Sequence, residues 1–600
     1  MSHIICIMKD AMNAVKNRKK ILGTVCLLWL LTLSYYVVRM MTPLLQSALL
    51  DGAVGVLNNT NSNLLLIIGF IGLFISEGIL ALYSSKWGIL FEKASNEIHI
   101  GIQSKIFDKL CKVPYSVFNS PQIYEKIELV SEKYSKYCSG FLAGRTLSSL
   151  IGTFISFVFT TIVLINVDPL IAFVVVCGNF FGIFKTWLEA KLNYYSTVEK
   201  MKERRYADTY KSALFDRNMI KEIKLLGLTD YIEKKWYEYT VRVNRKTMNY
   251  NVLFLLLDLT TYLIANAFTV ISLILTAKMI LNGETSIGSF ILVYSSSGAL
   301  IDTSGSLFGA FRELSSSSYY HSLYRDLMSM PNVEPNKSEA NCEKKSDVSF
   351  DILFDHVDFS YEGSENKIID DLCLNIKQGE KIAIVGENGC GKTTLVALLN
   401  RLYVPNKGEI FISGKSQADN LFGLRRCVST VFQDFGKYET SFRENIIMSD
   451  KSQHYSDEEV MMCVRKTGLE NKIHEFESGL DTPIGRFVPG GINLSGGEWQ
   501  KLAITRGLIP KDTKVLIMDE PNSALDPISE ATVYKQVFDA VKEDQTLILI
   551  THRLGAIRHV DRIIVMDHGR IIEDGSHDNL MEQKGKYFEM YNAQAKWYEV

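Results

Sequence analysis

The sequence has no excess of charge of either sign, and this absence removes one class of partner. Its 600 residues carry 65 lysines and arginines against 67 aspartates and glutamates, which gives a formal net charge of −2. A protein that binds nucleic acid through the phosphate backbone needs an excess of positive charge on the binding surface. We therefore expect no nucleic-acid partner.

Closely spaced cysteines are also missing. The ten cysteines are scattered along the chain, and no two of them are spaced as C-x-x-C. Pairs at that spacing are the usual sign of a zinc site or a redox disulfide. The sequence therefore predicts neither a metal cage nor a disulfide framework, and we interpret the cysteines as reduced thiols in the cytosol or the membrane.

What the chain does have is a sharp division between an apolar and a polar part. Residues 21–310 carry long apolar runs, whereas residues 350–600 have the composition of a soluble domain. The segment between them is poor in apolar residues and contains two prolines and a lysine pair. Because 600 residues are too many for one domain, we predict a transmembrane domain at 1–314, a linker at 315–349 and a soluble domain at 350–600.

Six apolar stretches are long enough to cross a membrane, for which about 20 residues are needed. They lie near residues 21–45, 63–85, 148–167, 169–187, 251–280 and 286–310. The third and fourth meet at a sequence typical of a tight turn, residues 166–169. An even number of spans places both ends of this domain on the same side of the membrane.

Basic residues predict which side that is. Five lysines and arginines precede the first span, whereas residues 46–62, the expected first external loop, have none. Cytoplasmic segments are enriched in these residues, so we expect both termini and the soluble domain in the cytoplasm. A signal peptide is the competing interpretation, but the apolar run is too long and no A-x-A-like site follows it.

Two connections between the spans are long and charged. They cover about residues 86–147 and 188–250 and largely lack glycine and proline. We expect the membrane helices to continue through them into the cytosol and to turn near residues 119–124 and 215–218, where each tip would meet another domain. Ordinary cytoplasmic loops are the alternative.

Three acidic residues fall inside the expected spans: Glu77, Asp258 and Asp302. Ionisable groups at such places usually face a cavity or a partner and mark a substrate path. The alternative is a position near a helix end, which the serine-rich surroundings of Asp302 would suit.

A phosphate-binding loop opens the soluble domain. Residues 386–393 read GENGCGKT, between an apolar strand at 382–385 and an apolar segment at 395–399 that can form a helix. This strand, loop and helix setting supports the G-x-x-x-x-G-K-[ST] match. Backbone N–H groups and the helix N-terminus would hold the phosphates. The expected nucleotide contacts are Gly386, Asn388, Gly389, Cys390, Gly391, Lys392, Thr393 and Thr394, with Lys392 on the β- and γ-phosphates and Thr393 on Mg²⁺.

Polar residues at the ends of three later strands complete a hydrolysis site. Asp519 follows the apolar run 515–518 and is placed to hold Mg²⁺, while Glu520 can act as general base on the attacking water. Gln433 follows the strand 428–432, where its amide can sense Mg²⁺ and water. His552 ends another strand and can contact the γ-phosphate, although a histidine at such a place is also often structural.

One aromatic residue is a candidate for the base of the nucleotide. Tyr361 precedes the first strands of the soluble domain and can stack on adenine. The alternative is a place in the core.

Residues 494–500, which read LSGGEWQ, resemble the signature motif of the ABC transporters. The phosphate loop, Gln433, Asp519, the segment 523–526 and His552 follow the order of that family. The resemblance to its exporter-type half-transporters spans nearly the whole chain. It implies an all-α six-helix transmembrane domain fused to an α/β P-loop ATPase domain that hydrolyses ATP with Mg²⁺.

The same resemblance implies a partner and a location. In this family two nucleotide domains close face to face, so Ser495, Gly496 and Gly497 would complete the ATP site of a second half-transporter chain. Asp526 joins the nucleotide-binding residues. One copy of each motif, with Glu520 and His552 both present, fits a homodimer. The protein would be a multi-pass protein of the cytoplasmic membrane, in contact with membrane lipid.

The substrate is predicted from two segments after Gln433. Residues 434–439 and 442–446 look like those of the lanthipeptide (lantibiotic) exporter subgroup. A modified, bacteriocin-like peptide is therefore the favoured substrate, with peptide-modifying enzymes as possible partners. Only about 20 residues precede the first span, which leaves no room for a leader-cleaving peptidase domain. Arg486 stands where the usual exporter pattern has Glu, so the details of coupling stay open.

Other functions are less well supported. Export of lipids or drugs is the main alternative. Peptide sensing or immunity without net transport belongs to another class, and intact Glu520 and His552 argue against it. The apolar spans exclude a soluble ATPase, and importers usually place membrane and nucleotide domains on separate chains.

Overall fold

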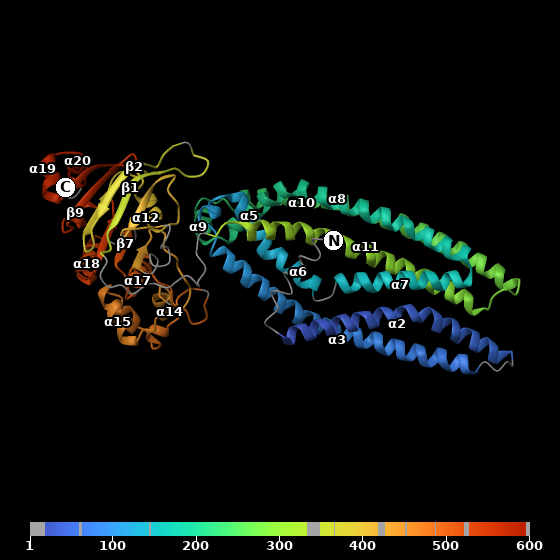
Figure 1. The fold of residues 1–600 in the computed structure, drawn as a ribbon. Coiled ribbons are helices and arrows are strands. Elements are labelled where there is room, and N and C mark those ends of the chain that lie inside the picture. Colours follow the sequence, from blue (N-terminus) through green and yellow to red (C-terminus); the bar gives the residue numbers. More distant parts are fainter. Residues whose placement is uncertain are drawn as a thin grey trace. The chain divides into compact units, whose positions relative to one another are not determined.

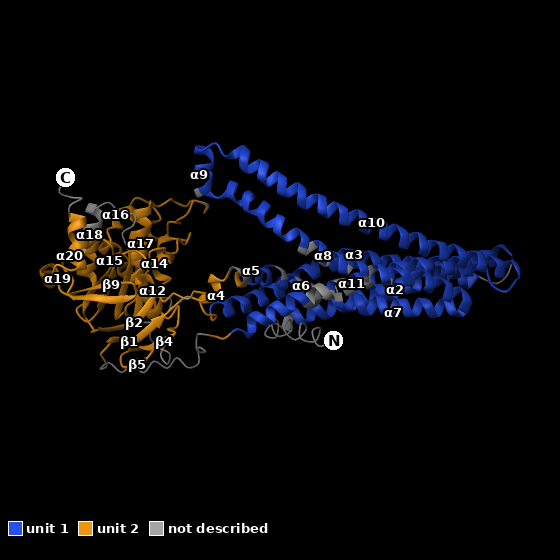
Figure 2. Ribbon diagram, turned by 90° about the horizontal axis from the view of Figure 1, so that it is seen from above, with its two compact units in different colours: residues 1–111, 125–330 blue, residues 112–124, 331–600 orange. Residues whose placement is uncertain are grey.

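The computed structural model describes residues 19–58, 63–142, 146–332, 349–364, 366–417, 427–450, 453–486, 488–520 and 527–595. The chain forms two compact units, coloured separately in Figure 2. One unit comprises Met1–Cys111 and Glu125–Met330, and the other comprises Lys112–Tyr124 and Pro331–Val600.

The first unit is helical (Figure 1). Its long helices are α2 (Lys19–Leu57), α3 (Asn63–Leu110), α7 (Thr146–Val167), α8 (Pro169–Phe215), α10 (Thr229–Leu281) and α11 (Gly288–Ser329). Shorter elements are a π-helical turn (Val130–Tyr134), α6 (Ser135–Leu142) and α9 (Arg217–Leu225). The helix α5 (Pro121–Leu129) crosses the boundary between the units, and its part from Glu125 onwards belongs to this one. Five of the six expected spans lie within one of the long helices, and the sixth, near 286–310, begins two residues before α11.

Four of these helices are long and apolar enough to cross a membrane by length and composition alone. They contain Ile21–Leu57, Asn63–Leu110, Leu147–Val167 and Thr229–Leu281. The expected fourth span lies in α8, whose apolar part is the shorter stretch Pro169–Gly182. The expected sixth lies in the serine-rich α11, which is not among the four helices of the described residues that are apolar enough.

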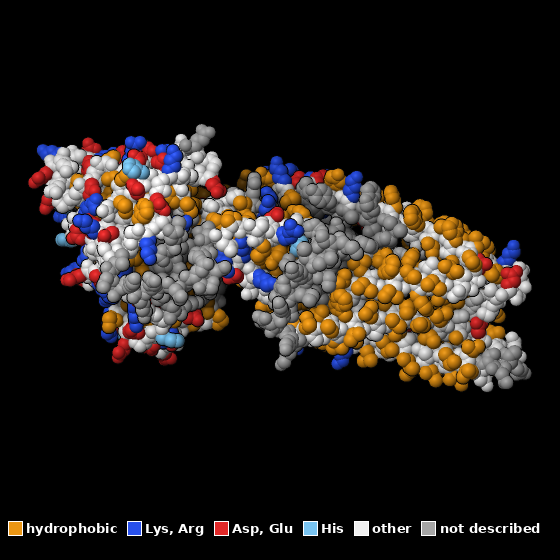
Figure 3. Space-filling model, viewed as in Figure 1, with side chains coloured by type: hydrophobic (Ala, Val, Ile, Leu, Met, Phe, Trp, Pro, Cys, Tyr) orange, Lys and Arg blue, Asp and Glu red, His pale blue; other side chains and the backbone are white. Residues whose placement is uncertain are grey.

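The surface of this unit is strongly apolar. Phe70, Phe74 and Phe173 are 65%, 78% and 67% exposed. Figure 3 shows hydrophobic side chains gathered over the visible face of α2, α3 and α7. Soluble monomers rarely expose contiguous apolar patches beyond a few hundred Å², so this surface suits a lipid environment.

Local chemistry explains where the helices turn. Asp168 caps α8, because its Oδ1 accepts from the N–H groups of Leu170 (2.7 Å) and Ile171 (3.2 Å). Pro169 occupies the first helical position, where a missing N–H costs nothing. Across the unit, Asp51 of α2 accepts from Ser286 (2.9 Å) and from the N–H of Gly288 (2.7 Å) at the start of α11.

The long charged connections are helical, as predicted. α3 and α8 run to Leu110 and Phe215, and α10 begins at Thr229. The expected tips are turns: α4 (Ser116–Asn119) ends just before α5, and Asp216 separates α8 from α9. The first tip, Lys112–Tyr124, belongs to the same compact unit as the soluble part of the chain.

One difference concerns the expected linker at 315–349. α11 continues to Ser329, well into that segment. Its serines bond back to their own helix, as Ser322 does to Tyr319 O (2.7 Å) and Ser329 to Asp326 O (2.8 Å). A low apolar content therefore did not mark the end of the helix.

The second unit is built around two sheets. Strands β10 (Arg570–Gly575), β9 (Arg562–Asp567), β3 (Lys381–Val385), β8 (Thr546–Ile550), β7 (Val515–Asp519) and β6 (Val428–Val431) form one sheet in that order. All neighbouring pairs in it are parallel except β9 with β10. The carboxyl ends of β3, β6, β7 and β8, where the predicted site residues lie, therefore meet at one edge.

The second sheet is antiparallel, in the order β2 (Ile369–Ile376), β1 (Ile352–Phe359), β4 (Lys407–Ile412) and β5 (Lys415–Ser416). The α-helices of this unit are α4, α12 (Lys392–Leu399), α14 (Phe442–Ile447), α15 (Asp457–Lys466), α16 (Glu470–His474), α17 (Gly496–Leu508), α18 (Pro527–Ala540), α19 (His577–Gln583) and α20 (Lys586–Ala595). Single 3₁₀ turns lie at Gly479–Asp481 and Leu554–Ile557.

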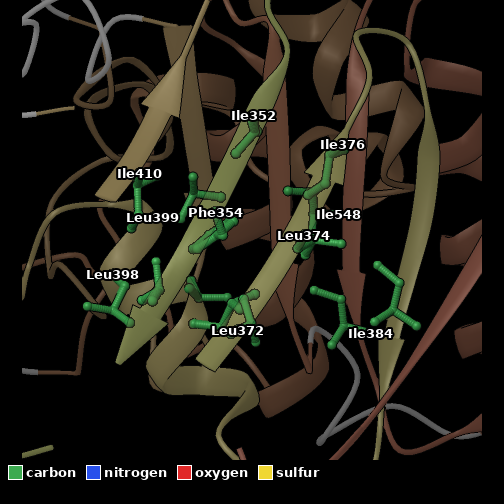
Figure 4. Close-up of a cluster of buried hydrophobic side chains, with 14 of the residues drawn as sticks. Ile352, Phe354, Leu372, Leu374, Ile376, Ile384, Leu398, Leu399, Ile410 and Ile548 are labelled. Carbon is green, nitrogen blue, oxygen red and sulfur yellow. The ribbon is translucent and has the colours of Figure 1, made fainter. Parts of the chain in front are cut away.

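The parallel sheet is buried on both faces, which is why its strands read as continuous apolar runs. One face, with Ile384 and Ile548, packs against α12 and the antiparallel sheet, whose Phe354 and Leu374 are fully or almost fully buried (Figure 4). The other face packs against α17, α18 and α20. This double support holds the strand ends, and the side chains that follow them, in place.

Candidate functional site

The phosphate loop connects β3 to α12 and depends on its glycines. Gly386, Gly389 and Gly391 have φ values of 154°, 85° and 108°, which side-chain-bearing residues rarely adopt. A Cβ on Gly386 would lie 2.2 Å from Met566 O, and one on Gly391 would lie 2.8 Å from Ile369 Cδ1. Only glycine fits at these two positions.

Lys392 begins α12 and is 94% buried, with 6% of its surface exposed. Its ammonium donates to the carbonyl oxygens of Gly386 (2.8 Å) and Glu387 (2.9 Å), so it lies over the concave side of the loop. A cation held there, beside the N-terminus of α12, favours the binding of phosphate. Burial beside this loop raises the pKa of the Cys390 thiol.

Asp519 ends β7 and is 1% exposed. Neither carboxylate oxygen has a hydrogen-bond partner by geometry among the described residues. Burial raises the pKa of Asp519 to about 6, and the nearby Thr393 hydroxyl partly opposes the shift. A buried carboxylate with free lone pairs beside a hydroxyl is a suitable pair of ligands for Mg²⁺. The residues present therefore fit the expected metal.

Glu520 lies between the two other predicted catalytic residues. Gln433 Nε2 donates to Glu520 Oε2 (3.1 Å), and His552 Nδ1 lies 3.4 Å from Glu520 Oε1. Glu520 has φ 46°, an unfavourable conformation for a residue with a side chain. Its N–H is held by Ile550 O (2.9 Å). The ends of β6, β7 and β8 thus bring an amide, a carboxylate and an imidazole together.

Tyr361 lies next to the phosphate-loop helix. Its hydroxyl is 2.9 Å from Thr394 Oγ1, and its ring packs edge-on against Phe359 and Tyr403, with centroids 5.1 and 5.3 Å away. The ring is still 36% exposed. It is therefore fixed in orientation and available on one side for stacking.

The signature residues begin α17. Ser495 accepts from the N–H of Glu498 (3.2 Å), and Glu498 accepts from the N–H of Ser495 (2.7 Å), which forms a capping box. Gly496 and Gly497 form the first turn without side chains, so the helix N-terminus is accessible to an anion. Asp526, the remaining predicted nucleotide contact, lies outside the described residues, as does the segment 523–526.

The segment 434–439, which follows Gln433, and the segment that leads to Arg486 pack against each other. Ile484 N donates to Thr440 O (2.7 Å), and Ser441 pairs with Pro483 in a β-bridge. A Cβ on Gly485 would lie 2.7 Å from Glu439 Cβ. Arg486, the residue that replaces the usual Glu, is exposed at the following turn. The end of the segment 434–439 and the residues just before Arg486 therefore belong to one local structure.

One positioning residue gave no signal in the sequence. Gln594 of α20 donates to the carbonyl of His552 and accepts from the N–H of Leu554 (2.9 Å). It fixes the backbone on both sides of the imidazole. A single glutamine near the end of the chain has no pattern that would connect it to a strand end 42 residues earlier.

The helical unit contains two ion pairs that the sequence reasoning missed. Arg39 of α2 bonds to Asp302 of α11 (2.5 Å), and Lys185 of α8 bonds to Asp258 of α10. Glu77 is exposed on α3. The two cations can be seen in the sequence, because Arg39 and Lys185 each lie inside an expected span, but their partners cannot.

Comparison with known proteins places both units in one family. Residues 369–523 match the family described as ABC transporter, and residues 25–304 match the ABC transporter transmembrane region. The toxin RTX-III translocation ATP-binding protein of Actinobacillus pleuropneumoniae is 30% identical over 513 residues, which are 84% of this chain and 69% of that protein.

Other relatives and a solved structure agree. The exotoxin translocation ATP-binding protein PaxB of Pasteurella aerogenes is 28% identical over 519 residues, and the leukotoxin translocation ATP-binding protein LktB of Mannheimia haemolytica is 29% identical over 512. Each match covers 84% of this chain and 69% of the relative. The structure of a bacterial Atm1-family ABC exporter with ATP bound is similar over 96% of this chain and 99% of that one, with a TM-score of 0.81 at 22% identity.

Proposed function

The chain belongs to the ABC transporter family as an exporter-type half-transporter whose ATP hydrolysis is coupled to transport, and on that premise we propose that it exports a polypeptide across the cytoplasmic membrane. The observation that carries the proposal is the similarity to translocation ATP-binding proteins for the toxin RTX-III and for leukotoxin. Within polypeptides, we propose a modified peptide of the lanthipeptide or bacteriocin type. Support for this finer class comes from residues 434–439 and 442–446 alone.

The roles of the site residues are part of the proposal. Lys392, with the loop and the start of α12, binds the nucleotide phosphates. Thr393, Gln433 and Asp519 would hold Mg²⁺, which would neutralise charge at the β- and γ-phosphates. Glu520 takes the proton of the attacking water, Gln433 senses the metal and this water beside Glu520, and His552 contacts the γ-phosphate.

The assembly and the orientation are proposed on the same basis. Two copies of the chain form a homodimer in which Ser495, Gly496 and Gly497 of one copy complete the nucleotide site of the other. Both termini and the nucleotide-binding unit lie in the cytoplasm. ATP shifts such a dimer towards its closed state only through higher affinity for that state.

Secretion of a peptide tests the substrate class directly. The chain is expressed with the precursor peptide encoded nearest to its gene, and the peptide is measured in medium and cytosol by mass spectrometry. Glu520→Gln is compared with the wild type. Glu477→Gln, on an exposed glutamate outside the site, is the matched control.

We expect peptide in the medium with the wild type and with Glu477→Gln, but not with Glu520→Gln. The same distribution of peptide in all three strains, with the wild type hydrolysing ATP, would reject peptide export and favour a lipid or drug as substrate. Release of the unmodified precursor as readily as the modified peptide would reject the finer class alone.

A further inference from the structure

The helical unit has an open cavity of about 830 Å³ between α8, α10 and α11. Gly182, Lys185 and Glu189 line it from α8, at the spacing of one helix face. α10 contributes Asp258 and apolar side chains, and α11 contributes small residues. The volume is in the range of small-ligand sites in proteins, which measure about 300–1,000 Å³.

Small residues on α11 keep this space open. A Cβ added to Gly305 or Gly309, both on the cavity wall, would meet no atom within 4 Å. Apolar side chains from α10, including Phe254 and Leu259, form much of the remaining wall. The cavity therefore combines apolar walls with a single charged region.

Among the described residues that line the cavity, the charged side chains have an excess of one negative charge. Lys185 bonds to Asp258 and lies 3.6 Å from Glu189, so one cation faces two carboxylates. The exposure of the three groups is unequal: the side chain of Asp258 is 62% exposed, whereas those of Lys185 and Glu189 are 21% and 13% exposed. The charge most accessible to a ligand is thus the carboxylate of Asp258.

We propose that this cavity binds a cationic group of the transported substrate, flanked by apolar groups, and that Asp258 is the residue that recognises the positive charge. A carboxylate that gains a second cationic partner forms a charge-assisted hydrogen bond, and the apolar walls beside Asp258 strengthen this attraction. Lys185 competes with the substrate for Asp258 and is retained by Glu189 when the substrate binds. An anionic substrate would instead meet two carboxylates and one largely covered cation.

The experiment measures binding of three blocked tripeptides to the full-length protein in lipid nanodiscs. The probes are N-acetylated, C-amidated Phe-Lys-Phe, Phe-Gln-Phe and Phe-Glu-Phe, which differ mainly in charge. Equilibrium dialysis against empty discs corrects for partition into lipid. We expect the wild type to bind the lysine probe about tenfold or more tighter than the glutamate probe, with the glutamine probe between them.

The two members of the ion pair should act in opposite directions. Asp258→Asn should reduce the preference for the lysine probe to within about twofold, whereas Lys185→Gln should tighten binding of that probe by removing its competitor. A purely structural ion pair would give losses in both variants. Asp258→Glu, which restores the charge, should restore the preference.

Asp302 provides a matched control. It is another carboxylate of the helical unit, with 61% of its side chain exposed and a single cationic partner, but it does not line the cavity. Asp302→Asn should keep the order of the three probes. Gly305→Val should weaken all three probes without changing their order, because it narrows the cavity at the α11 wall and leaves the charges in place.

The proposal is overturned if the wild type shows no preference, if it prefers the glutamate probe, or if Asp258→Asn retains the preference. This inference rests on the proposed transport function, but its experiment measures binding and not export. A chain that secretes peptide and ignores the charge of the probes rejects only this site. A chain that prefers cations and secretes no peptide rejects only the peptide substrate.

Discussion

Glu520 is fixed in position through both its side chain and its backbone. Its carboxylate contacts Gln433 and His552, and its backbone has a positive φ. Strain of this kind persists where the surrounding structure enforces it, and it is frequent at active sites. Two neighbours and an enforced backbone aim the carboxylate in one direction, as a general base needs.

Glu520→Gln should keep nucleotide binding and lose most turnover. The amide has the same shape but cannot accept a proton, and a positioned general base contributes about 10²- to 10⁴-fold to rate. We expect ATP hydrolysis by the membrane-embedded protein to fall by about that factor, while the dissociation constant for ATP changes by less than about threefold. Turnover at the wild-type rate would remove Glu520 from this role.

The residue scale shows what the sequence can predict about a site and what it cannot. The polar residues after three strands are assigned to one hydrolysis site from the sequence, and because β6, β7 and β8 are parallel and end at the same edge, these residues do lie together. The roles of these residues stay predictions. Gln594 and the ion pairs of Arg39 and Lys185 could not be derived in this way, since their partners are distant in sequence and the pairing depends on how helices pack.

At the scale of elements, an aromatic cluster joins the first tip, Lys112–Tyr124, to the rest of its compact unit. Tyr403 is 5.7 Å from Tyr115 and 5.3 Å from Tyr361 between ring centroids, and its hydroxyl accepts from the amide of Asn119. Tyr361 in turn contacts Thr394 of α12. If Tyr361 stacks on adenine as proposed, a change there can reach the tip through contacts within one compact unit.

Tyr403→Ala should weaken this connection at both ends. Each aromatic pair contributes about 0.5–1.5 kcal/mol beyond its buried area. Loss of the pair with Tyr361 should therefore raise the KM for ATP by about threefold to tenfold. Stimulation of ATP hydrolysis by substrate should fall further than basal hydrolysis.

Tyr403→Phe is the matched control, because it keeps the rings and removes only the bond from Asn119. Its KM for ATP should stay within about twofold of the wild type. If Tyr403→Ala also has a wild-type KM and normal stimulation, the cluster is merely part of the core.

Elements were predicted best where periodicity or a turn signal was strong. The turns near Asp168 and Asp216 and the helical continuations of α3 and α8 follow from local chemistry. The extent of α11 did not, because serines that bond to their own helix resemble a linker in composition. Composition reports solvent preference, whereas the end of a helix depends on what it packs against.

At the scale of the whole molecule, the chain has one phosphate loop and one signature. If two copies combine these parts as proposed, each nucleotide site takes its loop from one chain and its signature from the other. Two different inactive chains can then restore a site between them. Lys392→Ala should disable the loop, because it removes the cation bound over Gly386. Gly496→Asp should disable the signature, because it adds a negative charge where phosphate would approach the start of α17.

Each variant alone should trap no nucleotide with vanadate. In a mixed dimer, the intact loop of the Gly496→Asp chain meets the intact signature of the Lys392→Ala chain, while the second site carries both defects. Random pairing of equal amounts makes about half of the dimers mixed, so about a quarter of the wild-type number of sites should recover. Trapping by mixed chains at the level of either variant alone would show that two copies of this chain do not share their sites.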